Sequence, residues 1–279
     1  MTIVTVAYNS TAVLPEMLAS LPHQSPVVVV DNASEDRDRL HQIVAARQGK
    51  TLLIESDRNL GFGSGCNKGA EKATTEFLLF LNPDATLCSD TIRNLIEAAE
   101  RHPEASAFNP RILDNMGRTV FKRRSDLVDR SMWLPKRELK EDTEVPILSG
   151  AALFVRRRAF EAVGGFDPAI FLFFEDDDLS LRLSQSQGHL IYVTNADVHH
   201  AGGASSSGSA KSEYLKNWHW GHSQVYTTRK HGKRGNCVAA ILKTGVRALS
   251  PATVLSSRRR QKYFARFLGM IAALRHAGT

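Results

Sequence analysis

Cysteine is scarce in this sequence, with three residues in a chain of 279. Cys66, Cys88 and Cys237 are widely separated, form no metal-binding spacing and cannot all pair, which excludes a disulfide framework and indicates a reducing compartment. No segment approaches the roughly 18 consecutive apolar residues of a membrane-spanning helix. Residues 2–6 begin an apolar strand with no basic region before it, unlike a signal peptide. We therefore expect a cytoplasmic protein.

Acidic residues are almost absent from the C-terminal quarter of the chain. Residues 206–279 contain fourteen basic residues and only Glu213 as an acid, a net charge of +13, whereas the remaining chain carries −6. Such a basic tail indicates an anionic partner, either nucleic acid or a membrane surface. Residues 255–271 mix basic and apolar side chains, which favours an amphipathic helix on anionic lipid; the alternative is a solvated helix packed on the preceding domain. Because aromatic residues are few, no nucleic acid is expected.

The first 115 residues alternate short apolar runs with helical patterns, which predicts an α/β fold with a doubly wound, mostly parallel sheet. Strands are expected at 2–7, 27–30, 51–55, 77–81, 146–155 and 190–193, and helices at 11–20, 40–47, 65–72, 91–101, 158–163 and 176–187. Residues 115–144 are charged and aperiodic, and we expect a long surface excursion, a candidate mobile loop over the site. A flexible stretch at 202–209 and two or three helical segments should follow.

Carboxylates follow two of the expected strands. An apolar run stops at Pro83, which cannot donate to a sheet ladder, and Asp84 is left at the carboxyl end of a central strand. Open α/β sheets bind ligands at this edge, and a carboxylate there suits a divalent metal that carries a diphosphate. Asp31 closes an earlier strand and could accept hydrogen bonds from a base or ribose. The alternatives are that Asp84 caps the helix from about Thr91, and that Asp31 forms an Asx-turn with a cap at Ser34.

A glycine-rich segment, residues 59–69, leads into one of the expected helices. Glycine lets a backbone approach a ligand closely, and a helix N-terminus favours phosphate. The segment does not follow the first strand and lacks the spacing of the dinucleotide fingerprint, which disfavours a nicotinamide enzyme. The Gly-Lys-Ser/Thr of a P-loop is also missing.

Four consecutive carboxylates, residues 175–178, follow an aromatic pair. Acids stabilise the first turn of a helix, but four exceed what capping needs, and crowding raises pKa values as a general base requires. We expect one to face the cleft and the others to face solvent or an arginine. His199 and His200 are adjacent in a strand-like segment, so at most one can face the site. A lone histidine is more often a packing residue, although imidazole commonly joins an aspartate-held metal.

Taken in order, these segments resemble the family 2 glycosyltransferases of the GT-A fold, in particular the rhamnosyltransferase-like branch. The match covers roughly residues 2–205 at compatible spacing. The matching segments are Tyr8-Asn9, residues 31–34, residues 59–67, Asn82-Pro83-Asp84, Ser149-Gly150-Ala151, residues 164–167, residues 175–179 with Arg182, and His200 before Gly202-Gly203.

The resemblance implies a nucleotide-sugar donor, a divalent metal, either Mg²⁺ or Mn²⁺, and an inverting displacement. It assigns Asp176 as the base that deprotonates the acceptor, and Asp84 and His200 as metal ligands. Asn82 stands where many family members have an aspartate, so fewer negative charges surround the metal. The residues expected at the donor are Ala7, Tyr8, Asn9, Asp31, Asn32, Asn59, Gly61, Gly65, Asn67, Asn82 and Asp84. Those expected in the acceptor and sugar pocket are Ser149, Gly150, Ala151, Asp167 and Glu175.

The resemblance thus predicts a glycosyltransferase of cell-surface polysaccharide synthesis with a GT-A domain at 1–205 and a basic helical extension at 206–279. Within the domain, about 1–115 would bind the nucleotide sugar and about 145–205 would supply the acceptor site and the base. The preferred donor is dTDP-L-rhamnose, the acceptor a saccharide or polyprenyl-diphosphate-linked saccharide, and the location the inner face of the plasma membrane. The alternatives are an inactive nucleotide-sugar-binding protein and a nucleic-acid-binding protein.

Overall fold

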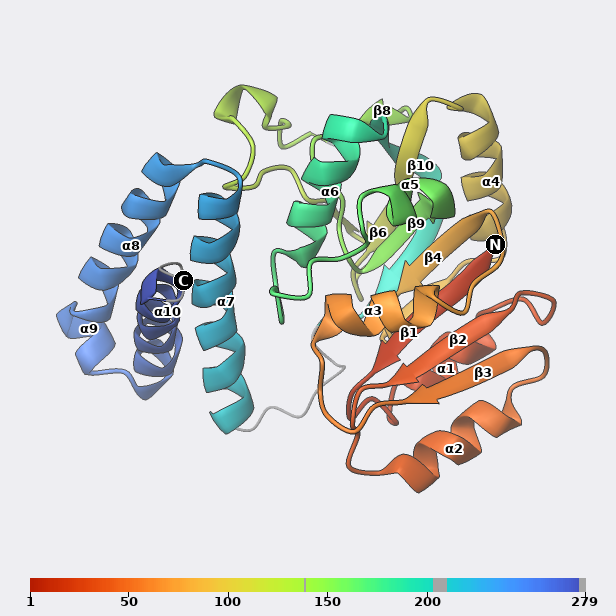
Figure 1. The fold of residues 1–279 in the computed structure, drawn as a ribbon, viewed down its shortest axis with the longest axis horizontal. Helices are drawn as coiled ribbons and strands as arrows, with labels where there is room; N and C mark the ends of the chain where they lie inside the picture. Colours follow the sequence, from red (N-terminus) through yellow and green to blue (C-terminus); the bar gives the residue numbers. More distant parts are fainter. Residues whose placement is uncertain (138, 203–209, 276–279) are drawn as a thin grey trace.

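A computed structural model describes residues 1–137, 139–202 and 210–275 of the chain. Figure 1 shows a twisted sheet covered by helices, with a separate group of helices from the C-terminal part of the chain standing beside it. The strands are β1 (Thr2–Ala7), β2 (Val27–Asp31), β3 (Thr51–Glu55), β4 (Phe77–Leu81), β5 (Ala85–Leu87), β6 (Ala105–Leu113), β7 (Thr119–Val120), β8 (Thr143–Glu144), β9 (Ala152–Arg156) and β10 (His189–His200).

The strand order along the sheet is β3-β2-β1-β4-β9-β6-β10-β5. Strands β1 to β4 are mutually parallel, β6 and β10 run in the same direction, and β9 and β5 run in the opposite direction. The predicted α/β class with a mostly parallel sheet is therefore confirmed. Because the order reverses between β1 and β4, the carboxyl ends of these two strands bound the crevice where such sheets bind ligands.

Helices cover the two faces of the sheet over separate apolar cores. The helices are α1 (Leu14–Ala19), α2 (Arg37–Ala46), α3 (Phe62–Ala70), α4 (Thr91–Arg101), α5 (Arg157–Ala162), α6 (Glu175–Ser186), α7 (Ala210–Lys230), α8 (Arg234–Ala248), α9 (Pro251–Val254) and α10 (Ser257–Arg275), with a 3₁₀ turn at Arg130–Met132. Alternate residues of β1 belong to the two cores. Ile3 lies in the core that contains residues of α1, α2 and α4, whereas Val4 lies in the core that contains residues of α3, α5 and α6. Burial of both strand faces explains the unbroken apolar runs in the sequence.

Several expected elements differ from the observed ones. Strand β6 was not predicted, because Asn109 and Pro110 interrupt its apolar pattern. Pro110 pairs with Val193 of β10 just before the register between the two strands shifts. The strand expected at 146–155 begins only at Ala152, and β10 continues to His200, well beyond the expected end. Proline and small polar residues punctuate a sequence, but pairing with neighbouring strands decides whether the backbone remains extended.

The excursion at 115–144 contains only short elements, as expected, but it is packed against the protein. Leu127 and Val128 are buried in it. The flexible stretch expected at 202–209 lies outside the described residues apart from Gly202.

Helices α7 and α10 pack closely through glycines. A Cβ added at Gly221 of α7 would lie 2.0 Å from the Arg266 carbonyl oxygen, and one added at Gly269 of α10 would lie 2.0 Å from the Trp218 carbonyl oxygen. The helix expected within residues 255–271 is present, and its inner side is buried against α7; contact of its outer side with lipid stays a prediction. Within the described residues, none of the helices has both the length and the apolar character needed to cross a bilayer.

Candidate active site

The donor side of the site starts at Asp31, which is fully buried at the end of β2. Its Oδ1 accepts a hydrogen bond from Ser34 N at 2.9 Å, three residues on, whereas an Asx-turn bonds the N–H two residues on. Ser34 is not a helix cap either, because α2 is capped by the Asp36 side chain. Among the described residues, no hydrogen bond reaches Asp31 Oδ2, and Arg37 Nε lies 3.4 Å from it. The contact of this oxygen with a nucleobase or ribose stays a prediction.

The ends of β1 and β2 are joined by side chains of the predicted donor set. Asn9, which follows Ala7 and Tyr8, has a left-handed backbone with φ of 53°. Its amide N–H donates to Ser34 Oγ at 3.0 Å, and its Oδ1 accepts from Glu35 N at 2.8 Å. Tyr8 is 40% exposed directly beside this turn. An exposed ring next to a buried carboxylate is an arrangement that suits a nucleobase.

The asparagines of the glycine-rich segment form hydrogen bonds within the protein. Asn32 Oδ1 accepts from Leu60 N at 2.8 Å, and Asn59 Oδ1 accepts from both Asn32 Nδ2 and Gly61 N at 2.9 Å. Asn67 exchanges two hydrogen bonds of 2.8 Å with the backbone of Phe166. These side chains fix the loop before α3 and its contact with the second half of the domain. A direct contact of theirs with the donor stays a prediction.

The glycines of this segment permit close packing. Gly61 has φ of 84°, and a Cβ there would lie 2.1 Å from the Phe171 carbonyl oxygen. A Cβ at Gly65 would lie 2.8 Å from Val6 Cγ1. Both positions exclude larger residues because of the protein itself, whatever a bound phosphate requires.

Asp84 and His200 lie together at the carboxyl edge of the sheet. Strand β5 pairs with the end of β10, so Ala85 is opposite His200, and His200 Nε2 lies 3.2 Å from Asp84 Oδ1. The Asn82 side-chain nitrogen lies 3.3 Å from the same imidazole nitrogen. Asp84 is buried and does not cap α4, whose N-cap residue is Asp90, so that alternative is wrong. His199 is exposed.

This pair fits a divalent cation that keeps several other ligands. Within residues 1–137, 139–202 and 210–275, no group of three or more His, Cys, Asp or Glu side chains is arranged to hold a metal. A single carboxylate with one imidazole is nevertheless sufficient for Mg²⁺ or Mn²⁺ when substrate phosphates and water complete the coordination.

Asp176 lies in the first turn of α6, and its carboxylate has three donors, one of which is Asp177 N, at 3.0 Å from Oδ1. Its Oδ2 accepts hydrogen bonds from Lys122 Nζ at 2.8 Å and from Gly150 N at 2.9 Å. A Cβ at Gly150 would lie 3.3 Å from Asp176 Cβ, so a small residue at this position lets the backbone approach the carboxylate. Ser149 is fixed by Asn109, whose Oδ1 accepts from Ser149 N at 2.9 Å. The carbonyl oxygen of Ala151 accepts from Asn82 N at 3.0 Å, which links this loop to the metal side.

The four carboxylates of α6 lie in different surroundings. Asp177 Oδ2 lies 2.9 Å from Lys122 Nζ, so one lysine serves both Asp176 and Asp177. Burial raises the pKa of Asp177 to about 6 although Lys122 opposes the shift. Burial and the charge of Asp176 raise the pKa of Glu175 to about 8. None of the four faces solvent, so that part of the expectation was wrong.

Lys122 is a residue of the candidate site that the sequence did not reveal. Burial disfavours its charge, but Asp176 and Asp177 outweigh burial and raise the pKa of its ammonium group. Lys122 belongs to the 115–144 segment, which contains many other cations, so no local signal distinguishes it. Asn109 was missed for a related reason, since it lies in the unpredicted strand β6.

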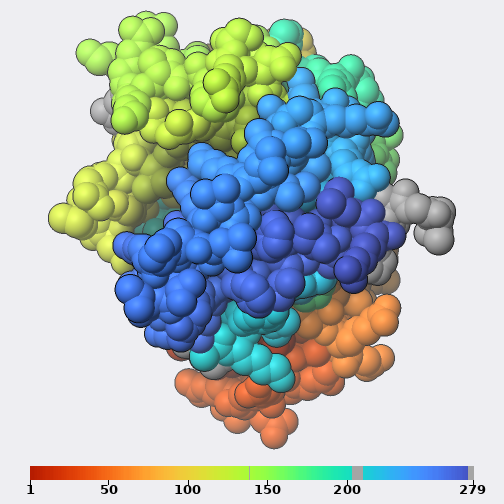
Figure 2. All heavy atoms as spheres, turned by 90° about the vertical axis from the view of Figure 1, so that its left-hand side faces the viewer, coloured from red at the N-terminus to blue at the C-terminus, as the bar shows by residue number. Residues whose placement is uncertain are grey.

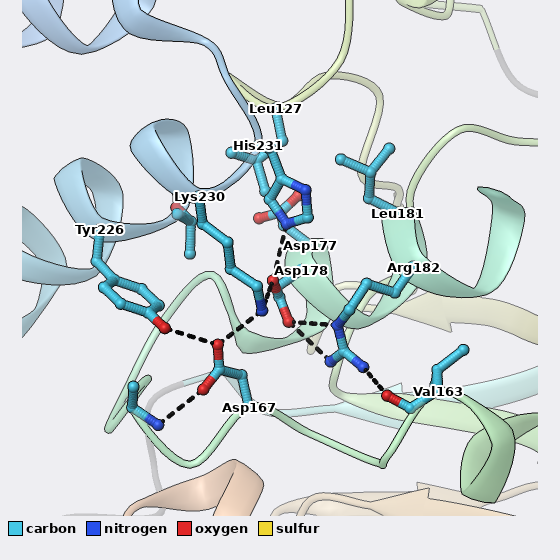
Figure 3. A network of polar contacts seen from close by, with 12 residues as sticks. Leu127, Val163, Asp167, Asp177, Asp178, Leu181, Arg182, Tyr226, Lys230 and His231 are labelled. Carbon is cyan, nitrogen blue, oxygen red and sulfur yellow. Dashed lines mark hydrogen bonds and ion pairs between the residues drawn. The ribbon is translucent and has the colours of Figure 1, made fainter. Parts of the chain in front are cut away.

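Asp167 and Asp178 face α7 in the network drawn in Figure 3. Asp167 Oδ2 accepts hydrogen bonds from Tyr226 at 2.9 Å and from Lys230 at 2.6 Å. Asp178 lies 2.7 Å from Arg182 Nη2, 2.8 Å from His231 Nε2 and 2.6 Å from Lys230 Nζ. Asp178 thus has the arginine partner expected for this cluster, whereas the role of Asp167 toward sugar hydroxyls stays a prediction.

Replacing Asp178 with Asn should destabilise the protein by about 2 to 4 kcal/mol, because breaking a buried ion pair leaves its partners unpaired. Although burial acts against it, hydrogen bonds from His231 and Lys230 and the charge of Arg182 lower the pKa of Asp178 to about 2. The stabilisation is therefore present above pH of about 4 and is lost as the pH falls toward 2. Denaturant unfolding of both proteins across this range measures the difference.

A matched control for this variant is Asp129→Asn. Asp129 also pairs with the C-terminal part, through Lys233 at 2.8 Å, but its side chain is 73% exposed. An exposed pair is worth about 1 kcal/mol or less. Equal losses in the two variants would show that burial of Asp178 has no special effect.

Helix α7 also supports the loop that precedes Asp176. His219 stacks on Phe171 with ring centroids 4.3 Å apart, and Ser223 Oγ donates to the Leu172 carbonyl at 2.9 Å. Phe173 and Phe174 have left-handed backbones with φ of 66° and 68°. Such a conformation is costly for residues with large side chains and persists only where the surroundings impose it.

Comparisons with known proteins agree with this geometry. The family described as "Glycosyl transferase family 2" matches residues 2–164. The N-acetylglucosaminyl-diphospho-decaprenol L-rhamnosyltransferase of Mycobacterium tuberculosis is 30% identical in an alignment of 249 positions that covers 78% of this chain and 80% of that protein. The rhamnosyltransferase WbbL of Escherichia coli K12 is 31% identical in an alignment of 133 positions that covers 43% of this chain and 50% of that protein.

A solved structure shows the same fold. The mannosyltransferase PcManGT from Pyrobaculum calidifontis, in complex with GDP-Man and Mn²⁺, is 16% identical and aligns with a TM-score of 0.60 over 99% of this chain and 87% of its own. The sheet order, the family match and the rhamnosyltransferase relatives agree with one another. The chain therefore belongs to glycosyl transferase family 2 and is a glycosyltransferase of the GT-A fold.

Proposed function

We propose that the protein transfers L-rhamnose from dTDP-L-rhamnose to a polyprenyl-diphosphate-linked saccharide, with inversion, during cell-surface polysaccharide synthesis. The observation that carries the proposal is that one loop is bonded to both parts of the candidate site: Gly150 N donates to Asp176, and the Ala151 carbonyl accepts from Asn82 N. The Asn82 side chain in turn lies 3.3 Å from His200. The donor and acceptor classes are inferred from the printed name of the Mycobacterium tuberculosis relative.

The chemistry follows from the position of the carboxylates. An inverting displacement needs a base that removes the acceptor proton on one side of the anomeric carbon, while the diphosphate leaves on the other. Asp176 would be this base, since Lys122 and Gly150 N hold its Oδ2 in a fixed direction. A fixed carboxylate loses little entropy when the acceptor hydroxyl meets it.

The opposite side of the site would bind the donor. Asp31 Oδ2 would accept a hydrogen bond from the base, and Tyr8 would pack against its ring. Asp84 and His200 would hold Mg²⁺ or Mn²⁺, which when bound supplies positive charge for the departing diphosphate. In this division, residues 1–115 bind the donor, residues 145–205 bind the acceptor and carry the base, and residues 206–279 are a basic extension. Because the acceptor carries a lipid, the protein would work at the cytoplasmic membrane surface.

The test is calorimetric titration with dTDP, UDP and GDP, each with and without Mn²⁺, followed by transfer assays with dTDP-rhamnose. Metal-dependent binding of dTDP together with transfer to a prenyl-diphosphate GlcNAc acceptor is the expected result. Binding without transfer or hydrolysis would instead favour the inactive nucleotide-sugar-binding protein. Binding of none of the three nucleotides would overturn the proposal.

Replacing Lys122 with Met should move the acidic limb of the pH–rate profile upward by about one pH unit, since a charge this close favours ionised carboxylates. Lys122 lowers the pKa of Asp177, so its loss makes the acidic cluster protonate at a higher pH. The measurement is kcat against pH for the wild type, Lys122→Met and Lys122→Arg. The arginine variant should restore the wild-type profile, and an unchanged limb in Lys122→Met would contradict the assignment.

A further inference from the structure

Helix α8 has aliphatic side chains on its outer face. Val238, Leu242, Val246 and Leu249 are 56%, 64%, 72% and 80% exposed, and they recur at intervals of four, four and three residues. This spacing places them along one side of the helix. The inner side uses small residues, with Cys237 and Ala248 buried. We call these four exposed residues the α8 stripe.

The stripe continues into the next element. Val254 and Leu255, at the end of α9, are 54% and 87% exposed. Isolated exposed aliphatic residues are ordinary on protein surfaces, but a row of them along successive elements marks an interaction site.

Basic residues flank the α8 stripe. Arg234, Lys243 and Arg247 are exposed on α8 itself, and residues 258–260, all arginine, are exposed at the start of α10. No acidic residue follows Glu213 in the sequence. Figure 2 shows the face formed by α8 and α10, drawn in blue, on the outside of the molecule.

We propose that the α8 stripe binds the surface of an anionic lipid bilayer, with its aliphatic side chains in the interface and the flanking cations on headgroup phosphates. This inference rests on the proposed function, which requires contact with a lipid-linked acceptor, and it names the surface that makes this contact. Stable attachment through a surface helix needs both apolar insertion and electrostatic attraction, and α8 supplies both.

The charge distribution favours lipid over two other occupants. A second copy of the chain in a two-fold arrangement would bring the same basic residues together without acids to pair them. Nucleic acid would match the charge, but it uses aromatic side chains for stacking, whereas the stripe is aliphatic. A bilayer with negative headgroups matches both the charge and the apolar character.

Flotation of the full-length protein with vesicles tests the proposal. Phosphatidylcholine vesicles with and without about 30% phosphatidylglycerol separate apolar insertion from electrostatic attraction. The protein should bind the anionic vesicles, and the affinity should fall when the salt concentration rises from about 0.1 to about 0.5 M. Wild-type protein that binds neither type of vesicle, or binds both equally, would overturn the inference.

The substitution Leu242→Glu should reduce binding to anionic vesicles about tenfold or more, because it removes an inserted side chain and adds a repelled charge. The matched control is Leu52→Glu, which makes the same change at a 43% exposed leucine on β3, in the catalytic domain. This control should bind like the wild type. Circular dichroism and thermal unfolding show whether both variants are folded, and for an unfolded variant Leu249→Glu replaces Leu242→Glu. Equal binding of the stripe and control variants would contradict the proposal.

Two further measurements distinguish lipid binding by the α8 stripe from self-association of the protein and from failure of the proposed function. Light scattering that shows a wild-type dimer, a Leu242→Glu monomer and unchanged vesicle binding would assign the stripe to self-association and overturn the proposal. Transfer to a water-soluble acceptor separates the two hypotheses. Transfer without vesicle binding overturns the lipid surface alone, whereas vesicle binding without nucleotide binding overturns the proposed function alone.

Discussion

Replacing Asp176 with Asn is expected to lower kcat about 10²- to 10⁴-fold, the usual contribution of a positioned general base. Asparagine has nearly the same shape, and its side-chain oxygen can still accept from Gly150 N, but it cannot take the acceptor proton. Binding of the nucleotide should change little, because Asp176 lies on α6, whereas Asp31 is at the end of β2 and Asp84 follows β4. Steady-state kinetics together with nucleotide titration measure both quantities.

The neighbouring carboxylate provides the control. Asp177 contacts the same ammonium group of Lys122, at 2.9 Å, so Asp177→Asn removes one negative charge from the same cluster. If Asp176 is the base, Asp177→Asn should retain most of the activity. A loss as large as that of Asp176→Asn would mean that the charge of the cluster, and not a single base, supports the reaction.

Replacing Asp84 with Ala should lower kcat/KM about 10²- to 10³-fold, since charge stabilisation by a metal supplies several kcal/mol. It should also abolish the dependence of nucleotide binding on Mn²⁺, which Asp176→Asn should leave intact. Asp84 is buried, with His200 Nε2 3.2 Å from its Oδ1, so an alanine there removes the only carboxylate of the pair. Calorimetry with and without Mn²⁺ measures the binding.

Adjacent histidines give this second prediction its own control. His200→Ala should weaken the metal-dependent binding, whereas His199→Ala should not, because His199 is exposed on the same strand. Equal effects at the two positions, or metal-dependent binding that survives Asp84→Ala, would place the cation elsewhere.

Local sequence patterns were sufficient for residues at strand ends. Asp31 and Asp84 follow apolar runs, so the rule that parallel sheets bind ligands at their carboxyl edge located both of them. His200 was preferred over His199 from the motif order, and its contact with Asp84 agrees. These positions depend on a few neighbouring residues, which a short segment of sequence contains.

Contacts between residues far apart in the sequence could not be predicted from such local patterns. Lys122 meets Asp176 across 54 positions, and Asp167 meets Lys230 across 63. The motif suggested Asp167 for sugar hydroxyls, but the side chains that donate to it, Tyr226 and Lys230, come from α7, outside the matched segments. Strand β6 was hidden by Pro110, which pairs with Val193 of β10, while Ala107 and Phe108 of the same strand pair with β9.

The support that α7 gives to residues 171–174 has a consequence for biosynthesis. Domains form from the N-terminus while the ribosome is still adding residues. Strands β1 to β4 can therefore pair before α7 is made, whereas the ring contacts of Phe171 with His219 and of Phe174 with Trp220 form only once α7 has been added. If Asp176 is the base, the loop before it gains its support from α7 only after the strands proposed to bind the donor have formed.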